Sequence, residues 1–492
     1  MAKYLVPASL LLLAQSIVAA SLFDSYVSLS FELIGFPTFA GTRSHPNSFS
    51  RNLIHNLAEL QGSGIVVRVG GNSGDRAIYD STLATATASA CPNADPGAWQ
   101  CIGTTFFESY GGFPAGTRYS HQFNLGAYNS SGWNTLQNTV PLACKALVGQ
   151  LEYWEVGNEP DLFIGSRRPS TYNASQYSTE WLNTTEHFES HLRRACPQLS
   201  HSIKYIAPSL SSPGARLHIG DIFQDEGNAT QKIIQVSVHN YMNGATVPGV
   251  TLQSTLMSHN AVVESIAGHI NYAKTSEINA DYIIGEHNSL YGGGASGLSD
   301  VFGAALWAME FSLYAASTDV IKRIHFHQSV GSPYAAWVPS GTLATKAPYY
   351  GKLAASAFLA HSNTIDIHTI ALNKDADKDS GYGAYINGDL QRVAVLNLRQ
   401  YNSGSGARGN QTYSVTVAPG SSWTSKRLTA PGATDTTGVT FNGFSYDADS
   451  NGLAKRVSGK ESGKIIRADH SGNITFTLQD SEAIVLLRNY MR

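Results

Sequence analysis

The feature that most constrains the fold of this chain is an alternation of short β-rich runs with longer helical patterns between residues 27 and 360. The β-rich runs, which we expect to be strands, are Val27–Ile34, Ile65–Val69, Tyr119–Leu125, Leu151–Val156, Tyr205–Pro208, Ile233–His239, Tyr282–Gly285 and Ile321–His327. The helical stretches are Ser48–Leu60, Leu136–Val148, Thr179–Arg194, Asn260–Lys274, Val301–Ala316 and Tyr350–Ala360, with Asn134, Ser258 and Ser299 as expected N-caps. Eight strands that alternate with helices over this length are typical of an α/β fold, the (β/α)8 TIM barrel. The alternative is a doubly wound open sheet, but no glycine-rich dinucleotide-binding turn follows the first strand.

The pattern changes after about residue 362, where long helices stop and short alternating runs take over. These runs are Thr364–Ala371, Gly383–Ile386, Val393–Leu398, Tyr413–Val417, Val439–Phe441, Ile474–Leu478 and Ala483–Leu487. Gly, Asn, Ser and Asp separate them, and we therefore predict a C-terminal antiparallel β-sandwich. The expected organisation is a signal peptide at 1–20, a barrel at 21–362 and a sandwich at 363–492. With 42% hydrophobic residues, the 492-residue chain can supply both cores.

The first twenty residues have the organisation of a secretory signal peptide. Lys3 gives a short positive start, residues 5–18 are mostly apolar, and Val-Ala-Ala at 18–20 offers small residues for cleavage before Ser21. The stretch is short for a membrane span, and no second long apolar run follows it. We expect a secreted, extracellular protein that has no membrane contact once this segment is removed.

The cysteines and glycosylation signals are consistent with an oxidising, secretory environment. The four cysteines are Cys91, Cys101, Cys144 and Cys196. We expect sequence neighbours to pair, 91 with 101 and 144 with 196, although four cysteines allow three connectivities. Asn-x-Ser/Thr sequons, which are possible surface glycosylation sites, begin at Asn129, Asn173, Asn183, Asn228, Asn410 and Asn473.

Charge and motif content exclude several classes of ligand. The formal net charge is −3 and no Lys/Arg-rich run occurs, so nucleic acid and other polyanions are poor partners. There is no P-loop, and we expect no cofactor. His325 and His327 share one face of the last barrel strand by the period of two, but acidic ligands beside them are not evident and we expect no metal. The sequence does not indicate an oligomeric state.

Two of the expected barrel strands lead into a carboxylate at their ends. Glu159 follows the fourth strand and Glu286 follows the seventh. Catalytic residues of such barrels lie at the C-terminal ends of the strands, and the fourth and seventh strands face each other. Glycoside hydrolysis needs one carboxylic acid that protonates the leaving oxygen, and one carboxylate that attacks the anomeric carbon or activates water. We therefore predict Glu159 and Glu286 as the catalytic pair.

The motifs around these carboxylates resemble those of glycoside hydrolase family 79, which contains β-glucuronidases and heparanase-like enzymes. The matching segments are Arg68-Val69-Gly70-Gly71-Asn72-Ser73, Trp154-Glu155-Val156-Gly157-Asn158-Glu159-Pro160-Asp161, His239-Asn240-Tyr241 and Glu286-His287-Asn288-Ser289-Leu290-Tyr291-Gly292-Gly293-Gly294. The resemblance implies that Glu159 is the acid/base and Glu286 the nucleophile of a retaining clan of (β/α)8 glycosidases. It also implies that Asn158 bonds the 2-hydroxyl of the sugar. It covers nearly the whole chain after the signal peptide, and family members likewise join a barrel to a sandwich.

A tyrosine and a glycine-rich loop carry the prediction of substrate. A Tyr241 hydroxyl bonded to the nucleophile would hold it ionised and oriented, and the resemblance places a tyrosine there. Tyr291 opens a run of three glycines, whose backbone N–H groups suit a carboxylate. The resemblance implies that Gly293, Gly294, Tyr291 and Tyr334 bind the C6 carboxylate of glucuronate. The alternatives are a packed aromatic and an ordinary flexible loop.

Other polar residues near the barrel mouth have less specific interpretations. Asn72 after the second strand and Glu32 near the end of the first could bind sugar hydroxyls, although single polar residues are common at a barrel mouth. We expect Arg68 and Glu155 to form a buried ion pair near the barrel floor, because a lone buried charge is costly. This pair would be structural or would tune the nucleophile.

These observations predict a secreted retaining glycoside hydrolase that acts on carbohydrate. The resemblance favours an exo-acting β-glucuronidase that removes terminal glucuronic acid or 4-O-methyl-glucuronic acid from glycans. One alternative is an endo-β-glucuronidase or heparanase-like enzyme, for which basic clusters beside the cleft are missing. Another is a neutral β-glycosidase of the same clan. A non-catalytic carbohydrate-binding wall protein is the third, and the presence of both carboxylates argues against it.

Overall fold

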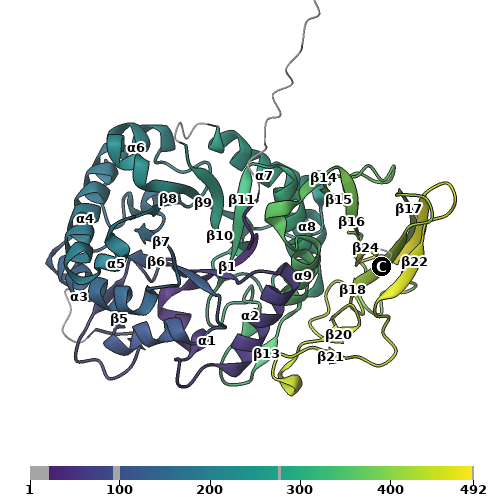
Figure 1. Ribbon diagram of the computed structural model, residues 1–492, viewed down its shortest axis with the longest axis horizontal. Coiled ribbons are helices and arrows are strands. Elements are labelled where there is room, and N and C mark those ends of the chain that lie inside the picture. Colours follow the sequence, from purple (N-terminus) through teal and green to yellow (C-terminus); the bar gives the residue numbers. More distant parts are fainter. Residues whose placement is uncertain (1–21, 92–99, 275–278, 490–492) are drawn as a thin grey trace, which may run out of the picture.

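The computed structural model describes residues 22–91, 100–274 and 279–489, so the predicted signal peptide at 1–20 lies outside the described residues. A barrel surrounded by helices lies beside an all-β part that carries the C-terminus (Figure 1). The predicted fold class, a (β/α)8 barrel with an antiparallel β domain, is confirmed. None of the helices in the described ranges is long and apolar enough to cross a membrane.

Eight parallel strands close the barrel in the order β1-β11-β10-β9-β8-β7-β6-β2. Their bounds are β1 Val27–Glu32, β2 Val66–Gly70, β6 Arg118–Phe123, β7 Leu151–Val156, β8 Tyr205–Leu210, β9 Ile233–Gly244, β10 Asp281–Tyr291 and β11 Ile321–Gln328. They correspond one to one to the predicted strands. Because all eight run in the same direction, their carboxyl ends meet at one rim of the barrel.

Helices cover the outer face of the barrel (Figure 1). Their bounds are α1 Phe36–Ala40, α2 Ser48–Gln61, α3 Ser130–Leu147, α4 Ala174–Ala195, α5 Pro197–Ser200, α6 Ile219–Glu226, α7 His259–Ala273, α8 Phe302–Ser317 and α9 Ala347–Phe358. Shorter helical turns are η1 Leu33–Gly35, η2 Thr104–Gly111, η3 Pro160–Phe163, η4 Gly227–Lys232, η5 Leu252–Leu256, η6 Ser362–Thr364 and η7 Ala448–Ser450. Between β2 and β6, η2 and a small sheet of β3 (Ala77–Tyr79), β4 (Thr87–Ala88) and β5 (Gln100–Ile102) take the place of a long helix. Helix α8 is buried on almost every face because it contacts both the barrel and the C-terminal sheet.

The C-terminal part consists of two antiparallel layers. The larger sheet has the order β14-β15-β16-β24-β18-β19-β20-β21, with β22 paired to β18, and the smaller contains β17 and β23. The bounds are β14 Asp366–Thr369, β15 Asp379–Ile386, β16 Asp389–Asn397, β17 Asn410–Thr416, β18 Ser422–Thr429, β19 Thr440–Phe441, β20 Phe444–Ser445, β21 Lys455–Arg456, β22 Lys464–Arg467, β23 Asn473–Gln479 and β24 Glu482–Asn489. A hairpin of β12 (Trp337–Val338) and β13 (Ala344–Thr345) precedes α9. Alternating apolar side chains of both layers form a separate core between them.

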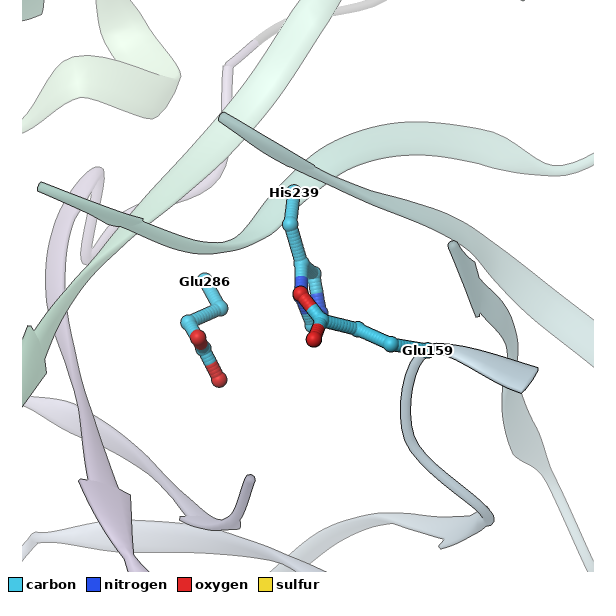
Figure 2. A group of neighbouring side chains, drawn as sticks. All are labelled: Glu159, His239 and Glu286. Atoms are coloured by element: carbon cyan, nitrogen blue, oxygen red, sulfur yellow. The ribbon is translucent and has the colours of Figure 1, made fainter. Parts of the chain in front are cut away.

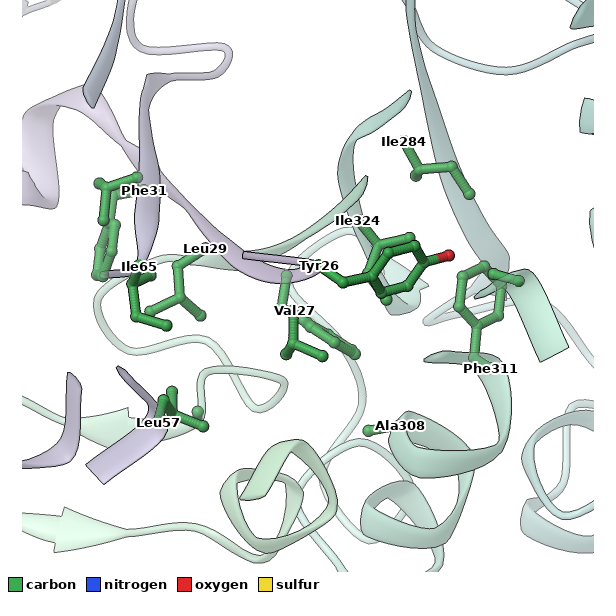
Figure 3. Close-up of a cluster of buried hydrophobic side chains, with 14 of the residues drawn as sticks. Tyr26, Val27, Leu29, Phe31, Leu57, Ile65, Ile284, Ala308, Phe311 and Ile324 are labelled. Carbon is green, nitrogen blue, oxygen red and sulfur yellow. The ribbon is translucent and has the colours of Figure 1, made fainter. Parts of the chain in front are cut away.

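A continuous hydrophobic core joins the barrel strands to the surrounding helices. Figure 3 shows part of this core, in which Val27 and Leu29 of β1 and Ile324 of β11 belong to one cluster with Ala308 and Phe311 of α8. Full burial of one large aliphatic or aromatic side chain contributes about 1.5–3 kcal/mol relative to exposure. This core fixes the strands, and with them the rim on which the polar side chains sit.

The interior of the barrel is polar, in contrast to its outer surface. Ser28 and Ser30 alternate along β1 with the apolar residues of the outer core and are fully buried. The hydroxyl of Ser30 accepts a hydrogen bond of 3.2 Å from Arg68 of β2. Polar side chains inside the barrel, such as Ser30 and Arg68, therefore contact one another beneath the rim.

Two rim strands extend beyond their predicted ends. Strand β9 continues to Gly244 and β10 to Tyr291, and the two pair with each other over these extensions. The register of β10 shifts between Ile284 and His287 on both neighbouring strands. Glu286 therefore lies at an irregular step within a strand, rather than after its end as predicted, and such bulges redirect a side chain.

Side-chain capping marks the starts of α3 and α7 but not that of α8. Asn129 caps α3, which begins before the predicted cap Asn134. Ser258 caps α7 as predicted. Ser299 does not cap α8, because its hydroxyl accepts a hydrogen bond of 3.1 Å from the N–H of Ala295 in the preceding loop.

Both predicted disulfides, Cys91–Cys101 and Cys144–Cys196, are present. The sequon asparagines that are exposed are Asn129, Asn173, Asn183 and Asn410, and Asn473 is half-buried. The side chain of Asn228 is outside the described part. Glycosylation at these positions stays a prediction.

Candidate active site

The side chains of Glu159, His239 and Glu286 converge at the carboxyl rim of the barrel (Figure 2). One carboxylate oxygen of each glutamate and one ring nitrogen of the histidine lie within 4.8 Å of one another, and all three residues are buried. A separation of about 5–5.5 Å between two carboxyl groups suits direct attack by one of them on an anomeric carbon, whereas about 6.5–9.5 Å leaves room for water. The pair has the shorter spacing, which suits double displacement.

A strained turn presents Glu159 to the barrel axis. Glu159 follows β7 with φ 47° and ψ 53°, a left-handed conformation that is uncommon for a residue with a side chain. Its N–H donates a hydrogen bond of 2.8 Å to the carbonyl of Ser209 on β8. Pro160 begins the helical turn η3 directly afterwards. The neighbouring strand and the proline hold the turn, and Figure 2 shows the resulting approach of Glu159 to the histidine.

Both oxygens of Glu286 are occupied by protein donors. Nη1 of Arg68 donates a hydrogen bond of 2.8 Å to Oε2, and the hydroxyl of Tyr241 donates one of 2.8 Å to Oε1. Nδ1 of His327 lies 3.5 Å from Oε2. Donors to both oxygens favour the ionised form and fix the plane of the carboxylate. The predicted bond from Tyr241 is present.

Arg68 connects the two sides of the site. As predicted it pairs with Glu155, through Nε at 2.8 Å and Nη2 at 2.9 Å. The same guanidinium reaches Glu286, and its Nη2 donates a hydrogen bond of 2.7 Å to Oδ1 of Asn158. The pair therefore lies directly against the two candidate catalytic strands and not near the barrel floor. A hydroxyl of Ser209 also donates to Glu155 at 2.5 Å, so this buried carboxylate is fully engaged.

The surroundings displace the pKa values of the two glutamates in opposite directions. Burial raises the pKa of Glu159 well above its usual range, and the negative charges of Glu286 and Asp161 add to the effect. Burial would also raise the pKa of Glu286, but the positive charges of His327 and Arg68 outweigh it and lower that pKa well below its usual range. The two carboxyls are thus displaced in the directions that a proton donor and an ionised nucleophile require.

His239 is a site residue to which sequence reasoning gave no role. Its Nδ1 lies 2.8 Å from Oε1 of Glu159. Burial lowers the pKa of His239 to about 4, so the ring is neutral at neutral pH. Its Nε2 is buried and has no hydrogen-bond partner in the described part of the chain. The available signal was its position two residues before Tyr241, which places both on the same face of β9.

Asn158 is held by its main chain and by its side chain. Its N–H donates a hydrogen bond of 2.7 Å to Asp75, and its Oδ1 accepts from Arg68. Its Nδ2 is buried without a hydrogen-bond partner among the residues described, so it remains an available donor beside Glu159. Asp75, which sequence reasoning missed, also accepts 2.8 Å from the N–H of Leu125. Burial raises the pKa of Asp75 to about 6.

His327 links the predicted sugar ligand Glu32 to the nucleophile candidate. Its Nε2 lies 3.6 Å from Glu32, and its Nδ1 faces Glu286. Burial acts to lower the pKa of His327, but these two carboxylates raise it overall. Glu32 also accepts hydrogen bonds from the N–H of Ser73, at 3.0 Å, and from its hydroxyl. Asn72 is exposed on the rim, and its neighbour Ser73 is the residue that contacts Glu32.

Three tyrosines lie close to one another near the glycine run, and one of them, Tyr241, bonds Glu286. The ring centroid of Tyr241 is 6.5 Å from that of Tyr291 and 6.3 Å from that of Tyr334. Gly292, Gly293 and Gly294 have φ values of 81°, 91° and 84°, so all three adopt a conformation that favours glycine. A Cβ on Gly294 would come within 2.9 Å of the backbone nitrogen of Tyr334. The predicted carboxylate-binding residues are thus brought together.

The cluster of Glu159, His239 and Glu286 also has distances that could hold a metal ion. Arg68 argues against this use, because its guanidinium donates to Glu286 within the same buried space. A bound cation would face this positive charge in a medium that screens little. The donor set fits a pair of catalytic carboxyls better than a metal centre.

Comparison with known proteins places the chain in a family. Residues 381–485 match the model of the glycosyl hydrolase family 79 C-terminal β domain. The chain is 40% identical over 494 residues to a β-glucuronidase of Aspergillus niger, an alignment that covers 94% of this chain and 90% of that protein. The chain belongs to glycoside hydrolase family 79. A β-glucuronidase of Neurospora crassa is 39% identical over 481 residues, covering 87% of this family 79 chain and 86% of the relative.

Solved structures agree with this assignment to family 79. A 4-O-α-L-rhamnosyl-β-D-glucuronidase from Fusarium oxysporum superposes with a TM-score of 0.77 at 26% identity, over 95% of this chain and 97% of that one. A family 51 α-L-arabinofuranosidase from Bifidobacterium longum gives 0.62 at 13% identity, over 96% and 97% of the two chains, and shares the fold alone. The family predicted from the motifs is confirmed, and the protein is a glycoside hydrolase.

Proposed function

We propose that this enzyme is a secreted, exo-acting, retaining β-glucuronidase in which Glu286 is the nucleophile and Glu159 the acid/base. The observation that carries the proposal is the opposite displacement of two carboxyl pKa values within one small site. Burial and neighbouring negative charge raise the pKa of Glu159, whereas His327 and Arg68 hold down that of Glu286. A proton donor and a nucleophile must differ in this way at the same pH.

In the first step, an oxygen of Glu286 attacks the anomeric carbon and forms an ester bond to it. The bond between that carbon and the aglycone oxygen breaks, and its electron pair stays on the oxygen. Glu159 transfers its proton to this oxygen, so the aglycone leaves as a neutral alcohol. Tyr241 and Arg68 hold the attacking carboxylate in place before the reaction.

In the second step, a water replaces the aglycone and attacks the same carbon. Glu159, which is now ionised, accepts a proton from this water, and the ester bond to Glu286 breaks. Glu286 carries no charge while it is esterified. The repulsion from Glu286, which adds to the effect of burial on the pKa of Glu159, is then absent, so that pKa falls and Glu159 becomes suited to act as a base. The enzyme returns to its initial protonation state.

His239 and Asn158 have supporting parts in this mechanism. The neutral imidazole of His239 contacts Oε1 of Glu159 and fixes the orientation of the acid. The available amide donor of Asn158 lies beside Glu159, where it can bond the 2-hydroxyl of the sugar. Hydrogen bonds to that hydroxyl strengthen as the transition state forms.

The glycine run and its neighbouring tyrosines support glucuronate as the sugar. Backbone N–H groups in successive left-handed residues form a concave donor set that suits a carboxylate. Gly293 and Gly294 provide this backbone, and Tyr291 and Tyr334 lie beside it. The two curated relatives described above are named β-glucuronidases.

Exo-action is supported by contact between two loops at the barrel mouth. The N–H of Tyr334 donates a weak hydrogen bond of 3.4 Å to the carbonyl of Gly293. The loop after β11 and the loop after β10 therefore meet on the side where the sugar carboxylate would lie. This contact closes one side of the barrel mouth, and a closed mouth favours a pocket for a terminal sugar over an open groove.

The test is hydrolysis of p-nitrophenyl β-D-glucuronide, compared with the corresponding β-glucoside and β-xyloside. We expect selective cleavage of the glucuronide, and we expect Glu286→Gln to abolish it. Glu264→Gln is the matched control, because Glu264 is exposed on α7. Preference for a neutral glycoside would reject the sugar, and full activity of Glu286→Gln would reject the nucleophile.

A further inference from the structure

A lysine outside the catalytic cluster anchors the loop that carries Tyr334. Lys346 lies between β13 and α9. Its Nζ donates hydrogen bonds to two consecutive carbonyls, 2.8 Å to Ser332 and 3.3 Å to Pro333. Its own N–H donates 2.9 Å to the carbonyl of Ala336. Lys346 thus holds the middle and the end of the loop after β11.

This loop forms one wall of the proposed carboxylate site. Tyr334 is 5% exposed and packs 6.3 Å, between ring centroids, from Tyr241, which bonds the nucleophile. Asn288 of β10 donates 3.4 Å to the carbonyl of Tyr334, and the N–H of Tyr334 faces Gly293. A displacement of the loop would therefore move both a tyrosine and a partner of the glycine run.

The position of the ammonium also affects the contact between the Tyr334 loop and the glycine run. The carbonyl of Pro333 and the N–H of Tyr334 belong to one peptide group, and in a trans peptide they point in opposite directions. A cation at the carbonyl oxygen polarises the group and strengthens the hydrogen bond that its N–H donates to the carbonyl of Gly293. Lys346 is half-buried, so solvent screens its charge only partly. Burial lowers the pKa of Lys346, and the negative charge of Asp300 opposes this effect.

We infer that Lys346 is a positioning residue that makes the site selective for a sugar carboxylate, by holding the Tyr334 loop and placing a positive charge behind it. The inference rests on the proposed function. The groups expected to touch the carboxylate are neutral amides and tyrosine hydroxyls, and a desolvated carboxylate needs compensating charge. Lys346 supplies it from the opposite side of the loop without contact to the substrate.

The experiment compares Lys346→Met and Lys346→Arg on the p-nitrophenyl β-glucuronide and β-glucoside. Methionine nearly keeps the length of the lysine side chain but removes its charge and its hydrogen-bond donors. Arginine keeps the charge and the donors. We expect Lys346→Met to raise KM for the glucuronide about ten-fold with kcat nearly unchanged, because the bound carboxylate loses support in both ground and transition state. Its kcat/KM for the glucoside should stay within about two-fold of wild type, and Lys346→Arg should restore most of the loss.

Lys464→Met is the control, since its side chain is 63% exposed on β22 of the sandwich. If Lys346→Met does not fold, as judged by thermal unfolding, Lys346→Gln replaces it because an amide can still donate to a carbonyl without carrying charge. Equal changes on both sugars, or no rescue by arginine, overturn the role of Lys346 while the proposed function stands. A wild-type enzyme that shows no preference for the glucuronide overturns both.

Discussion

Nη1 of Arg68 lies 2.8 Å from Oε2 of Glu286, and both side chains are almost completely buried. The same guanidinium pairs with Glu155 and bonds Asn158, so one cation orders residues of β10, of β7 and of the turn after β7. The nucleophile candidate is consequently held by a group that is itself fixed at several points. This arrangement, more than either glutamate alone, defines the geometry of the site.

Arg68→Lys should therefore impair both activity and stability. A lysine keeps the charge but cannot make the forked bonds to Glu155 and reach Glu286 at the same time. We expect kcat to fall roughly a hundred-fold, and the free energy of unfolding to fall by about 1–3 kcal/mol, because buried acceptors lose their hydrogen-bond donors. Steady-state kinetics and urea unfolding measure the two effects. Wild-type values for both would show that the network has no such role.

Tyr241→Phe should shift the acidic side of the pH profile. The hydroxyl of Tyr241 bonds Glu286 and contributes to the lowering of its pKa. Without it that pKa rises, and the nucleophile is protonated at a higher pH. We expect the acidic limb of kcat/KM to move upward by about one pH unit, since a hydrogen bond to a charged group is worth about 1.5–3 kcal/mol.

Tyr401→Phe is a suitable control for this shift, because Tyr401 lies in the sandwich and its hydroxyl donates to the carbonyl of Gly406. An acidic limb that stays at the same pH in Tyr241→Phe would mean that the observed hydrogen bond does not tune Glu286.

Glu159→Ala should affect substrates according to their leaving groups. An alkyl β-glucuronide needs a proton on its leaving oxygen, so its hydrolysis should slow by about 10²–10⁴-fold. Formation of the glycosyl-enzyme from p-nitrophenyl β-glucuronide should be less affected, because p-nitrophenolate leaves without protonation. Added azide, which needs no general base, should increase turnover of the aryl substrate and yield a β-glucuronyl azide. Equal losses on both substrates and no azide product would rule out Glu159 as acid/base.

Lys352→Met should stabilise the protein, and more at low pH than at high pH. Lys352 of α9 is fully buried, its Nζ lies 4.2 Å from the ring centroid of Phe326, and burial lowers its pKa to about 7. Below pH 7 the lysine is charged in both states, and the full penalty for burying the charge acts on the folded state. Between pH 7 and the unfolded value of about 10.4 only the unfolded chain keeps the proton, so this penalty declines.

We expect the substitution to raise the free energy of unfolding by about 1–4 kcal/mol at pH 6, and by less at pH 9. Chemical unfolding at the two pH values measures the difference. Destabilisation at pH 6, or the same effect at both pH values, would contradict this interpretation of the buried charge.

The parts of the structure that were predictable are those encoded by local patterns. Apolar runs bounded by turn residues located all eight barrel strands, and the pairing of sequence neighbours among the cysteines gave the observed disulfides. Glu159 and Glu286 could be proposed as candidates because such barrels place their chemistry at the carboxyl rim, and the structure brings the two side chains together there. The interior pairing of Arg68 with Glu155 followed from the cost of a lone buried charge.

The parts that were not predictable depend on where distant strands meet. The contact of His239 with Glu159 arises only when β9 faces the strained turn after β7. The register shift that places Glu286 within β10 comes from pairing with its neighbours, which a periodicity in one strand does not report. Ser299 had the sequence of a helix cap, but the glycine loop competes for its hydroxyl.

The most direct test of the central claim is to trap the glycosyl-enzyme with 2-deoxy-2-fluoro-β-D-glucuronyl fluoride and to locate the label by peptide mass spectrometry. This probe reacts at the anomeric carbon, and its fluorine slows hydrolysis of the ester that forms. A retaining β-glucuronidase with the proposed nucleophile will lose activity with time and carry one label on Glu286. A label on another residue would contradict the assignment of the nucleophile. Continued turnover of the probe without any covalent adduct would contradict the double-displacement mechanism.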